Sequence, residues 1–96
     1  MKYRIEITEL KDGRKRYTPQ VEITETRGGI LTKREETVWV NILKGYPSRP
    51  TYEITKTGRE SWGTEEEALE IIEGHKERIR VENGAQPSNV TYKMID

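Results

Sequence analysis

Apolar and polar residues alternate along much of the chain, which is typical of strands that bury one face. The first example runs from Tyr3 to Ile7, where tyrosine and isoleucine alternate with charged residues. The same pattern predicts strands over residues 3–7, 14–24, 37–43, 51–57 and 90–94. The polar segment 26–36, which contains two adjacent glycines, is expected to connect the second strand to the third.

The loop between the first two strands can be assigned from the register that it imposes. A two-residue Asp12-Gly13 loop would mix apolar and polar side chains on each face of the hairpin. A three-residue loop over 11–13, with Gly13 in the left-handed conformation, keeps one face apolar. This register predicts the cross-strand pairs Ile7–Tyr17, Ile5–Pro19 and Tyr3–Val21. Because proline cannot donate to a ladder, Pro19 is expected at a local break or an edge.

One helix is expected after the fourth strand. Thr64 and Glu67 form a capping box, so the helix should begin after Thr64, run to about Arg80 and stop at Asn83-Gly84. Its apolar stripe consists of Ala68, Ile72, His75 and Ile79, flanked by Leu69 and Ile71. The predicted fold class is α+β: an antiparallel sheet of four to five strands with one α-helix packed on one face, in the order ββββαβ.

Composition narrows the class of protein. The chain has 96 residues, and we expect a single domain over 1–96. Only 31% of the residues are hydrophobic and 35% are charged, so the core should be thin. There is no cysteine, which excludes disulfides and thiolate metal sites. No apolar run has the length of a signal peptide or a membrane span, so a cytoplasmic location is expected.

The residue types that most enzymes use are scarce. His75 is the only histidine, and its position in the apolar stripe indicates a packed or partly buried core residue. No serine lies in a nucleophile-elbow motif, and the usual transition-metal ligand sets need more histidine or cysteine. We therefore expect no enzymatic activity, no catalytic residue, no metal and no cofactor.

Two residues of the helical region need an explanation. Gly74 lies inside the predicted helix, where glycine costs about 1 kcal/mol relative to alanine. Either another chain approaches closely there, or the helix simply tolerates the glycine. Trp62 precedes the helix and is expected to pack on its first turn as a hydrophobic staple.

Trp39 is the first candidate for contact with a partner. If the apolar face of the 37–43 strand packs on the helix, Trp39 points to the opposite face, with Thr37 and Asn41 beside it. One helix covers one face of a sheet, and tryptophan is enriched at interface hot spots. The alternative is that the 27–36 segment folds back and covers the indole. The partner would be another protein or a second copy of the chain, as in a homodimer.

Basic residues near aromatic ones form a second candidate site. They fall mostly in turns and at strand ends, with Tyr17, Tyr46 and Trp39 among them, which is a composition used by sheets that bind nucleic acid. The alternative is an ordinary solvated surface whose acidic residues neutralise the basic ones. The residues in question are Arg14, Lys15, Arg16, Arg27, Lys33, Arg34 and Arg49.

Two resemblances bear on function. The segment Trp62–Ala68, following antiparallel strands, resembles the sheet-to-helix junction of AP2-type and integrase arm-binding domains, in which a helix braces a DNA-reading sheet. The whole chain is similar to short uncharacterised bacterial and phage proteins. That second resemblance implies an accessory protein that inhibits or adapts a host system. The sequence thus favours a protein-binding module, with nucleic-acid binding as the alternative.

Overall fold

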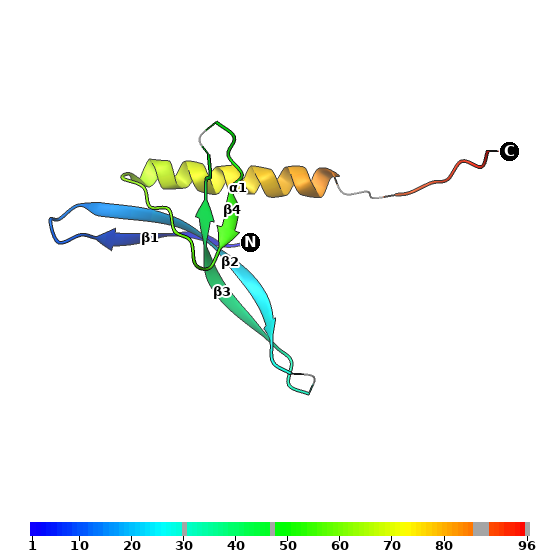
Figure 1. Cartoon of the computed structure of the whole chain (residues 1–96), viewed down its shortest axis with the longest axis horizontal. Helices are drawn as coiled ribbons and strands as arrows, with labels where there is room; N and C mark the ends of the chain where they lie inside the picture. The colour runs from blue at the N-terminus through cyan, green and yellow to red at the C-terminus, as the bar shows by residue number, and fades with distance from the viewer. Residues whose placement is uncertain (30, 47, 86–88, 96) are drawn as a thin grey trace.

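The fold, given by a computed structural model that describes residues 1–29, 31–46, 48–85 and 89–95, consists of one sheet and one helix (Figure 1). Neighbouring strands are all antiparallel, and their order in the sheet follows the chain. Helix α1 packs on one face, mainly against β2, which confirms the α+β class. The elements are β1 (Tyr3–Glu9), β2 (Lys15–Arg27), β3 (Arg34–Leu43), β4 (Glu53–Thr55) and α1 (Glu65–Ala85).

The first hairpin has the predicted register. Gly13 has a φ of 89°, and its amide donates to the Leu10 carbonyl, which closes the three-residue loop. The pairs Ile7–Tyr17, Ile5–Pro19 and Tyr3–Val21 all form, so one face of the hairpin carries its apolar side chains. The register was predictable because a slip of one residue would have moved these side chains to the wrong face.

Pro19 lies where the ladder between β2 and β3 begins. That ladder starts at the pair Gln20–Asn41, whereas the Tyr17 amide and carbonyl bond instead to Trp62 at 2.9 and 2.8 Å. The amides and carbonyls of odd-numbered β2 residues therefore point away from β1. Because Pro19 is one of these residues, the N–H that it lacks is not needed by the ladder between β1 and β2. The predicted break is present on this side of the strand.

The β2–β3 hairpin is longer than its sequence pattern indicated. Its ladder continues to the pair Arg27–Arg34, so strand structure occupies both ends of the segment that we expected to be a connection. The distal half reaches beyond the helix and has little to pack against (Figure 1). Polarity therefore did not mark a loop here, because a two-stranded ribbon in solvent can be polar on both faces.

The core lies between α1 and the middle of the sheet. Val21, Val40 and Ile42 on β2 and β3 are almost fully buried against Ile71 and Ile72 of the helix. These sheet residues are on the expected face, since the 37–43 strand directs its valines and Ile42 towards the helix. Few large residues are fully buried, as a composition of 31% hydrophobic residues implies.

Helix α1 begins where the capping residues predict. The Glu67 amide donates to Thr64 Oγ1 at 3.2 Å, and the Glu67 carboxylate accepts from the Gly63 amide at 3.2 Å. The helix continues to Ala85, five residues past the predicted end near Arg80, and includes Asn83 and Gly84, so the predicted stop at these two residues is wrong. Its buried residues are Ala68, Ile71, Ile72 and His75, whereas Leu69 stays 46% exposed.

Two predicted strands need correction. The fourth strand is limited to Glu53–Thr55, and Tyr52 just before it adopts a positive φ of 49°. The closing strand predicted over 90–94 is wrong for this structure: residues 89–95 have no regular secondary structure and are exposed. Alternation makes a segment suitable for a sheet, but a strand also needs a neighbour to bond its backbone.

Gly74 is explained by a close approach within the same chain. A Cβ atom placed on Gly74 would lie 2.3 Å from Cζ of Tyr52, far inside normal contact. The ring of Tyr52 packs directly against the helix backbone, and Arg78 holds the preceding turn by donating to the carbonyls of Thr51 and Tyr52 at 3.1 and 3.2 Å. Simple tolerance of the glycine is therefore the wrong interpretation.

Candidate functional site

The sheet face opposite the helix is partly covered by the segment 56–61, between β4 and α1. Asn41 Nδ2 donates to the Gly58 carbonyl at 2.8 Å, and Thr18 Oγ1 bonds to Ser61 Oγ at 2.9 Å. Arg59 reaches across to pair with Glu6. Thr18 and Gln20 on this face are consequently 0% and 6% exposed. The expectation that one helix leaves the opposite face bare is wrong for this half of the sheet.

A chain of side-chain hydrogen bonds runs across the strands below this segment. Arg4 Nε donates to Gln20 Oε1 at 2.7 Å, and Gln20 Nε2 donates to Asn41 Oδ1 at 2.8 Å. Asn41 then donates to Gly58. Because these buried amides are satisfied, the network fixes the covering segment on the sheet. Asn41, predicted as a partner-binding residue, has its polar atoms engaged within the chain.

Trp39 lies beyond the covering segment, on the same helix-free face. Its side chain is half-buried, and Cζ of Arg4 is 4.3 Å from the centroid of the indole. The described residues of the 27–36 segment do not cover it. The β2–β3 ladder ends with Arg27 opposite Arg34, which is five residues before Trp39 on β3. The tip of this hairpin points away from the helix and the rest of the sheet (Figure 1). The indole is therefore neither bare nor covered by that segment, but stacked under one guanidinium.

The residues around Trp39 form a small mixed surface. Glu22 faces Trp39 across the β2–β3 ladder, and Thr37, two residues before Trp39 on β3, is exposed. We call Arg4, Glu22, Thr37 and Trp39 the Trp39 surface. Of the three residues predicted to bind a partner, Trp39 and Thr37 belong to it. The sequence did not reveal Arg4, because its approach depends on the strand register.

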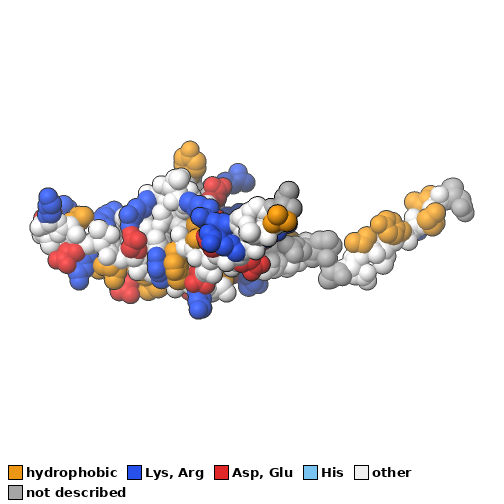
Figure 2. All heavy atoms as spheres, turned by 90° about the horizontal axis from the view of Figure 1, so that it is seen from below, with side chains coloured by type: hydrophobic (Ala, Val, Ile, Leu, Met, Phe, Trp, Pro, Cys, Tyr) orange, Lys and Arg blue, Asp and Glu red, His pale blue; other side chains and the backbone are white. Residues whose placement is uncertain are grey.

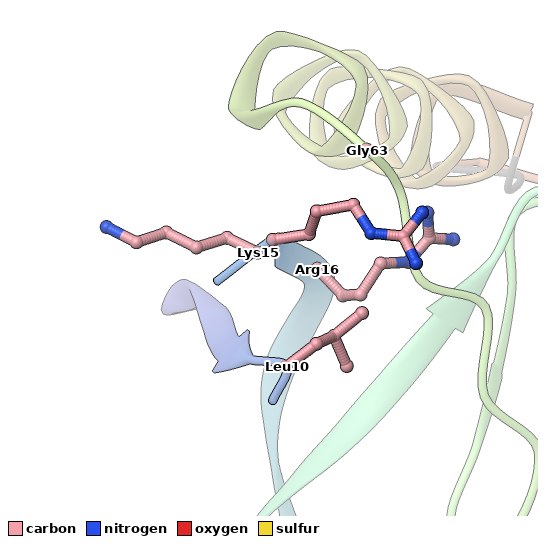
Figure 3. A pocket seen from close by; sticks show the side chains of 5 residues that line it. Leu10, Lys15, Arg16 and Gly63 are labelled. Atoms are coloured by element: carbon pink, nitrogen blue, oxygen red, sulfur yellow. The ribbon is translucent and has the colours of Figure 1, made fainter. Parts of the chain in front are cut away.

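Arg14, Lys15 and Arg16 lie together at the free end of the β1–β2 hairpin. With Leu10 and Gly63 they line an open hollow of about 550 Å³ (Figure 3). Arg14 is paired with Asp12 at 2.6 Å, and Arg16 Nη2 donates to the Ser61 carbonyl at 2.5 Å. The Lys15 side chain extends away from that of Arg16 in Figure 3. Two of these three cations therefore already have partners within the chain.

The remaining basic residues are far from this end. Arg27, Lys33 and Arg34 are at the tip of the β2–β3 hairpin, and Arg49 is in the turn before β4. Arg27 and Arg34 both pair with Glu36, at 3.2 and 3.0 Å. Figure 2 shows basic and acidic side chains interspersed on the visible face. The predicted basic set is thus divided among three turns instead of forming one surface.

His75 is a core residue, as its place in the apolar stripe indicated. It is 3% exposed, and its Nδ1 lies 2.9 Å from the Tyr3 hydroxyl. Burial lowers the pKa of His75 below its ordinary value, and the nearby charge of Arg78 lowers it further. Burial also raises the pKa of Tyr3. Within the described residues, no group of three His, Asp or Glu side chains is placed to hold a metal ion.

Trp62 closes one end of the core beside the start of α1. It packs against the buried cluster, and Lys44 Nζ lies 5.8 Å from its ring centroid. Its indole Nε1 is buried without a hydrogen-bond partner among the described residues. Trp62 lies two positions before Thr64, and its backbone pairs with that of Tyr17 in β2.

Comparison with known proteins gives no relative. No family model matches the sequence, and no curated protein or solved structure is significantly similar to it. The resemblances to sheet-and-helix DNA-binding domains and to short bacterial and phage proteins remain predictions. In the described part of the chain, no helix combines the length and the apolar character needed to cross a membrane.

Proposed function

We propose that this protein is a non-enzymatic protein-binding module and that the Trp39 surface holds its partner. The observation that carries the proposal is the half-buried Trp39 on the helix-free face, with Arg4 stacked on its ring at 4.3 Å. Tryptophan and arginine dominate interface hot spots, since each gives a large contact area together with a polar group. A stacked arginine also adds a cation–π attraction that strengthens once water is removed.

The surroundings of this pair favour binding. Arg4 is held by Gln20, which is itself held by Asn41, so the guanidinium is ordered before any partner arrives. Preorganisation reduces the entropy lost on association. Glu22 and Thr37 supply polar groups beside the indole, in the manner of the polar rim that surrounds an apolar anchor. The covering segment 56–61 borders the surface and restricts the partner to the Trp39 side of the face.

The partner that we propose follows from the resemblance to short bacterial and phage proteins. Such an accessory protein would act in the cytoplasm as a stoichiometric inhibitor or adaptor of a host protein. Nucleic-acid binding is the less favoured alternative. The basic residues that would carry it lie at three separate turns, and several are paired with acidic side chains. Affinity for nucleic acid rises with the number of phosphates that lysine and arginine neutralise together, and dispersed cations contact fewer phosphates at once.

The test is capture of the partner from a host lysate by the wild-type chain and by three variants. We expect Trp39→Ala and Arg4→Ala to lose the partner, with a loss of at least 2 kcal/mol for Trp39, or about 30-fold in affinity. Tyr46→Ala is the matched control, because Tyr46 is an aromatic residue that is 79% exposed in the connection between β3 and β4, outside the Trp39 surface. It should retain the partner fully.

Two further measurements separate the alternatives. Treatment of the lysate with nuclease leaves a protein partner bound but removes one that is held through nucleic acid. Affinity that falls steeply with salt concentration indicates phosphate contacts. Equal capture by Trp39→Ala, Arg4→Ala and Tyr46→Ala would contradict the proposed surface, and sensitivity to nuclease with a steep salt dependence would favour the alternative.

A further inference from the structure

The outer edge of β1 presents unpaired backbone groups. β1 is at one end of the four-stranded order, with no described strand on its outer side. The Glu22 amide donates to the Lys2 carbonyl at 2.9 Å, and the Leu10 amide donates to the Arg14 carbonyl at 2.7 Å. The even-numbered residues of this chain segment therefore bond to β2. By the alternation of an antiparallel ladder, the odd-numbered residues of β1 direct their amides and carbonyls outward.

β1 is not protected by short length, proline or a bulge, and its charged residues Arg4 and Glu6 lie on the face away from the helix. It has seven residues and no proline, and its register with β2 is continuous, without a bulge. The opposite edge, β4, has only three residues and offers little to pair with. Tyr3, Ile5 and Ile7 share the helix side of β1, and Ile7 is 57% exposed. A long, regular and partly apolar edge of this kind favours addition of another strand.

One side of α1 would complete the site for an added strand. Lys76 Nζ lies 5.3 Å from the ring centroid of Tyr3, so this side of the helix faces the β1 edge. Leu69 lies seven residues before Lys76, close to two helical turns, and is therefore on the same side. Leu69 is 46% exposed, so both it and Ile7 leave apolar surface uncovered.

The C-terminal segment 89–95 has the sequence of a strand but pairs with no described strand. Val90, Tyr92 and Met94 alternate with polar residues, and together with Ile95 they are between 62% and 88% exposed. The segment continues outward past the end of α1, away from the sheet (Figure 1). Its apolar side chains stand clear of the body in Figure 2. In this structure it makes no strand pairing with its own β1.

We propose that two copies of this chain form a twofold dimer, in which the C-terminal segment of each copy pairs with the outer edge of β1 in the other. In this arrangement Val90, Tyr92 and Met94 lie on the helix side, against Ile7 and Leu69. Main-chain hydrogen bonds to the outward groups of β1 supply affinity, as in other strand additions. Because the exchange is reciprocal, both edges are paired and the assembly closes. The interface uses the outer edge and the helix side of β1, whereas Arg4 of the Trp39 surface projects from the opposite face of the same strand. The dimer does not depend on the proposed function.

The first test measures the mass of the full chain by sedimentation equilibrium over a range of concentrations. A dimer has twice the chain mass of 11.2 kDa. We expect Tyr92→Asp to weaken the dimer at least tenfold, since it places a charge against the helix side. Thr91→Asp is the matched control: it makes the same charge change on the other face of the segment and should leave most of the affinity intact. Both positions lie outside the core, so the circular dichroism of the folded body should not change.

The second test measures hydrogen exchange of the Ile5 and Ile7 amides. We expect both amides to be protected in the dimer, with protection that falls on dilution and in Tyr92→Asp. A chain that is monomeric at all concentrations, or a dimer unaffected by Tyr92→Asp, would overturn the proposal. Protection that is independent of concentration in a monomer would also overturn it, because the segment would then be pairing with β1 of its own chain.

Discussion

Replacement of Gly74 by alanine should destabilise this protein, although the same change in an ordinary helix stabilises it. Gly74 is within α1, where alanine is favoured by about 1 kcal/mol on helix propensity alone. The new Cβ, however, would lie 2.3 and 2.4 Å from two ring atoms of Tyr52. Helix propensity therefore favours the alanine variant, whereas the contact with Tyr52 disfavours it. The measured free energy of unfolding shows which of the two effects is larger.

The magnitude follows from how far Tyr52 must move. Carbon atoms in favourable contact are about 3.5 Å apart, so the ring must retreat by about 1.2 Å. The ring packs against the core, and Arg78 bonds to the backbone of the same turn, so the retreat disturbs both. Overpacking costs about 1–3 kcal/mol, and we expect the upper end. After the propensity gain, Gly74→Ala should lose about 2 kcal/mol, or roughly 8–16 °C in Tm.

A double-mutant cycle measured by urea unfolding checks this reasoning. In a Tyr52→Ala background the obstruction is absent, so Gly74→Ala should stabilise by about 1 kcal/mol, which gives a coupling of about 3 kcal/mol. Gly84→Ala is the control, because Gly84 is helical and has nothing within 4 Å of an added Cβ. It should be neutral or stabilising. If Gly74→Ala stabilises the wild-type chain by the same amount as the Tyr52→Ala chain, the steric argument is refuted.

Two other predictions concern stability. Burial lowers the pKa of His75 in the folded protein, so on acidification the unfolded chain binds a proton at His75 first. The contribution of neutral His75 to the free energy of unfolding is therefore fully present above about pH 6.5 and is lost as the pH falls below that value. Urea unfolding between pH 7.5 and 5.5 should show this loss in the wild type and a flatter profile in His75→Leu; equal profiles would contradict it. Thr64→Ala should cost about 1 kcal/mol through loss of the N-cap bond to Glu67, whereas Thr64→Ser should cost little; thermal unfolding in which both variants lose equally would exclude a capping role.

Local sequence rules accounted for features that depend on neighbouring residues. The loop of the first hairpin, its register and the left-handed Gly13 followed from face matching over a few residues. The start of α1 followed from Thr64 and Glu67, and the buried helix residues from the apolar stripe. The inner face of β3 followed from simple alternation. For the hairpin register, the helix stripe and the β3 face, the competing arrangement would have placed apolar side chains in water; for the helix start, it would have left backbone amides without the capping bonds. Local information was therefore sufficient.

The candidate site could be predicted only in part. Trp39 was assigned to the helix-free face by strand period, and it lies on the same side of the sheet as Asn41 and the covering segment 56–61. The segment itself was missed, because nothing in its residues shows that it crosses the sheet. Arg4 is 35 residues from Trp39 in the chain, and only the β1–β2–β3 register brings the two together. The prediction of a single basic surface was wrong because its residues belong to turns that the tertiary structure places apart.

By itself, the sequence determined which residues prefer strands, where the helix starts and which faces are apolar, because these depend on periods of two and 3.6 residues and on capping groups. Only the tertiary structure decided what lies against those faces. It placed Tyr52 on Gly74, laid segment 56–61 over Thr18 and Gln20, and left 89–95 without a strand partner. Such contacts join residues that are distant in the chain. Which of them form depends on which packing of the whole chain buries the most apolar surface, and no local pattern carries that information.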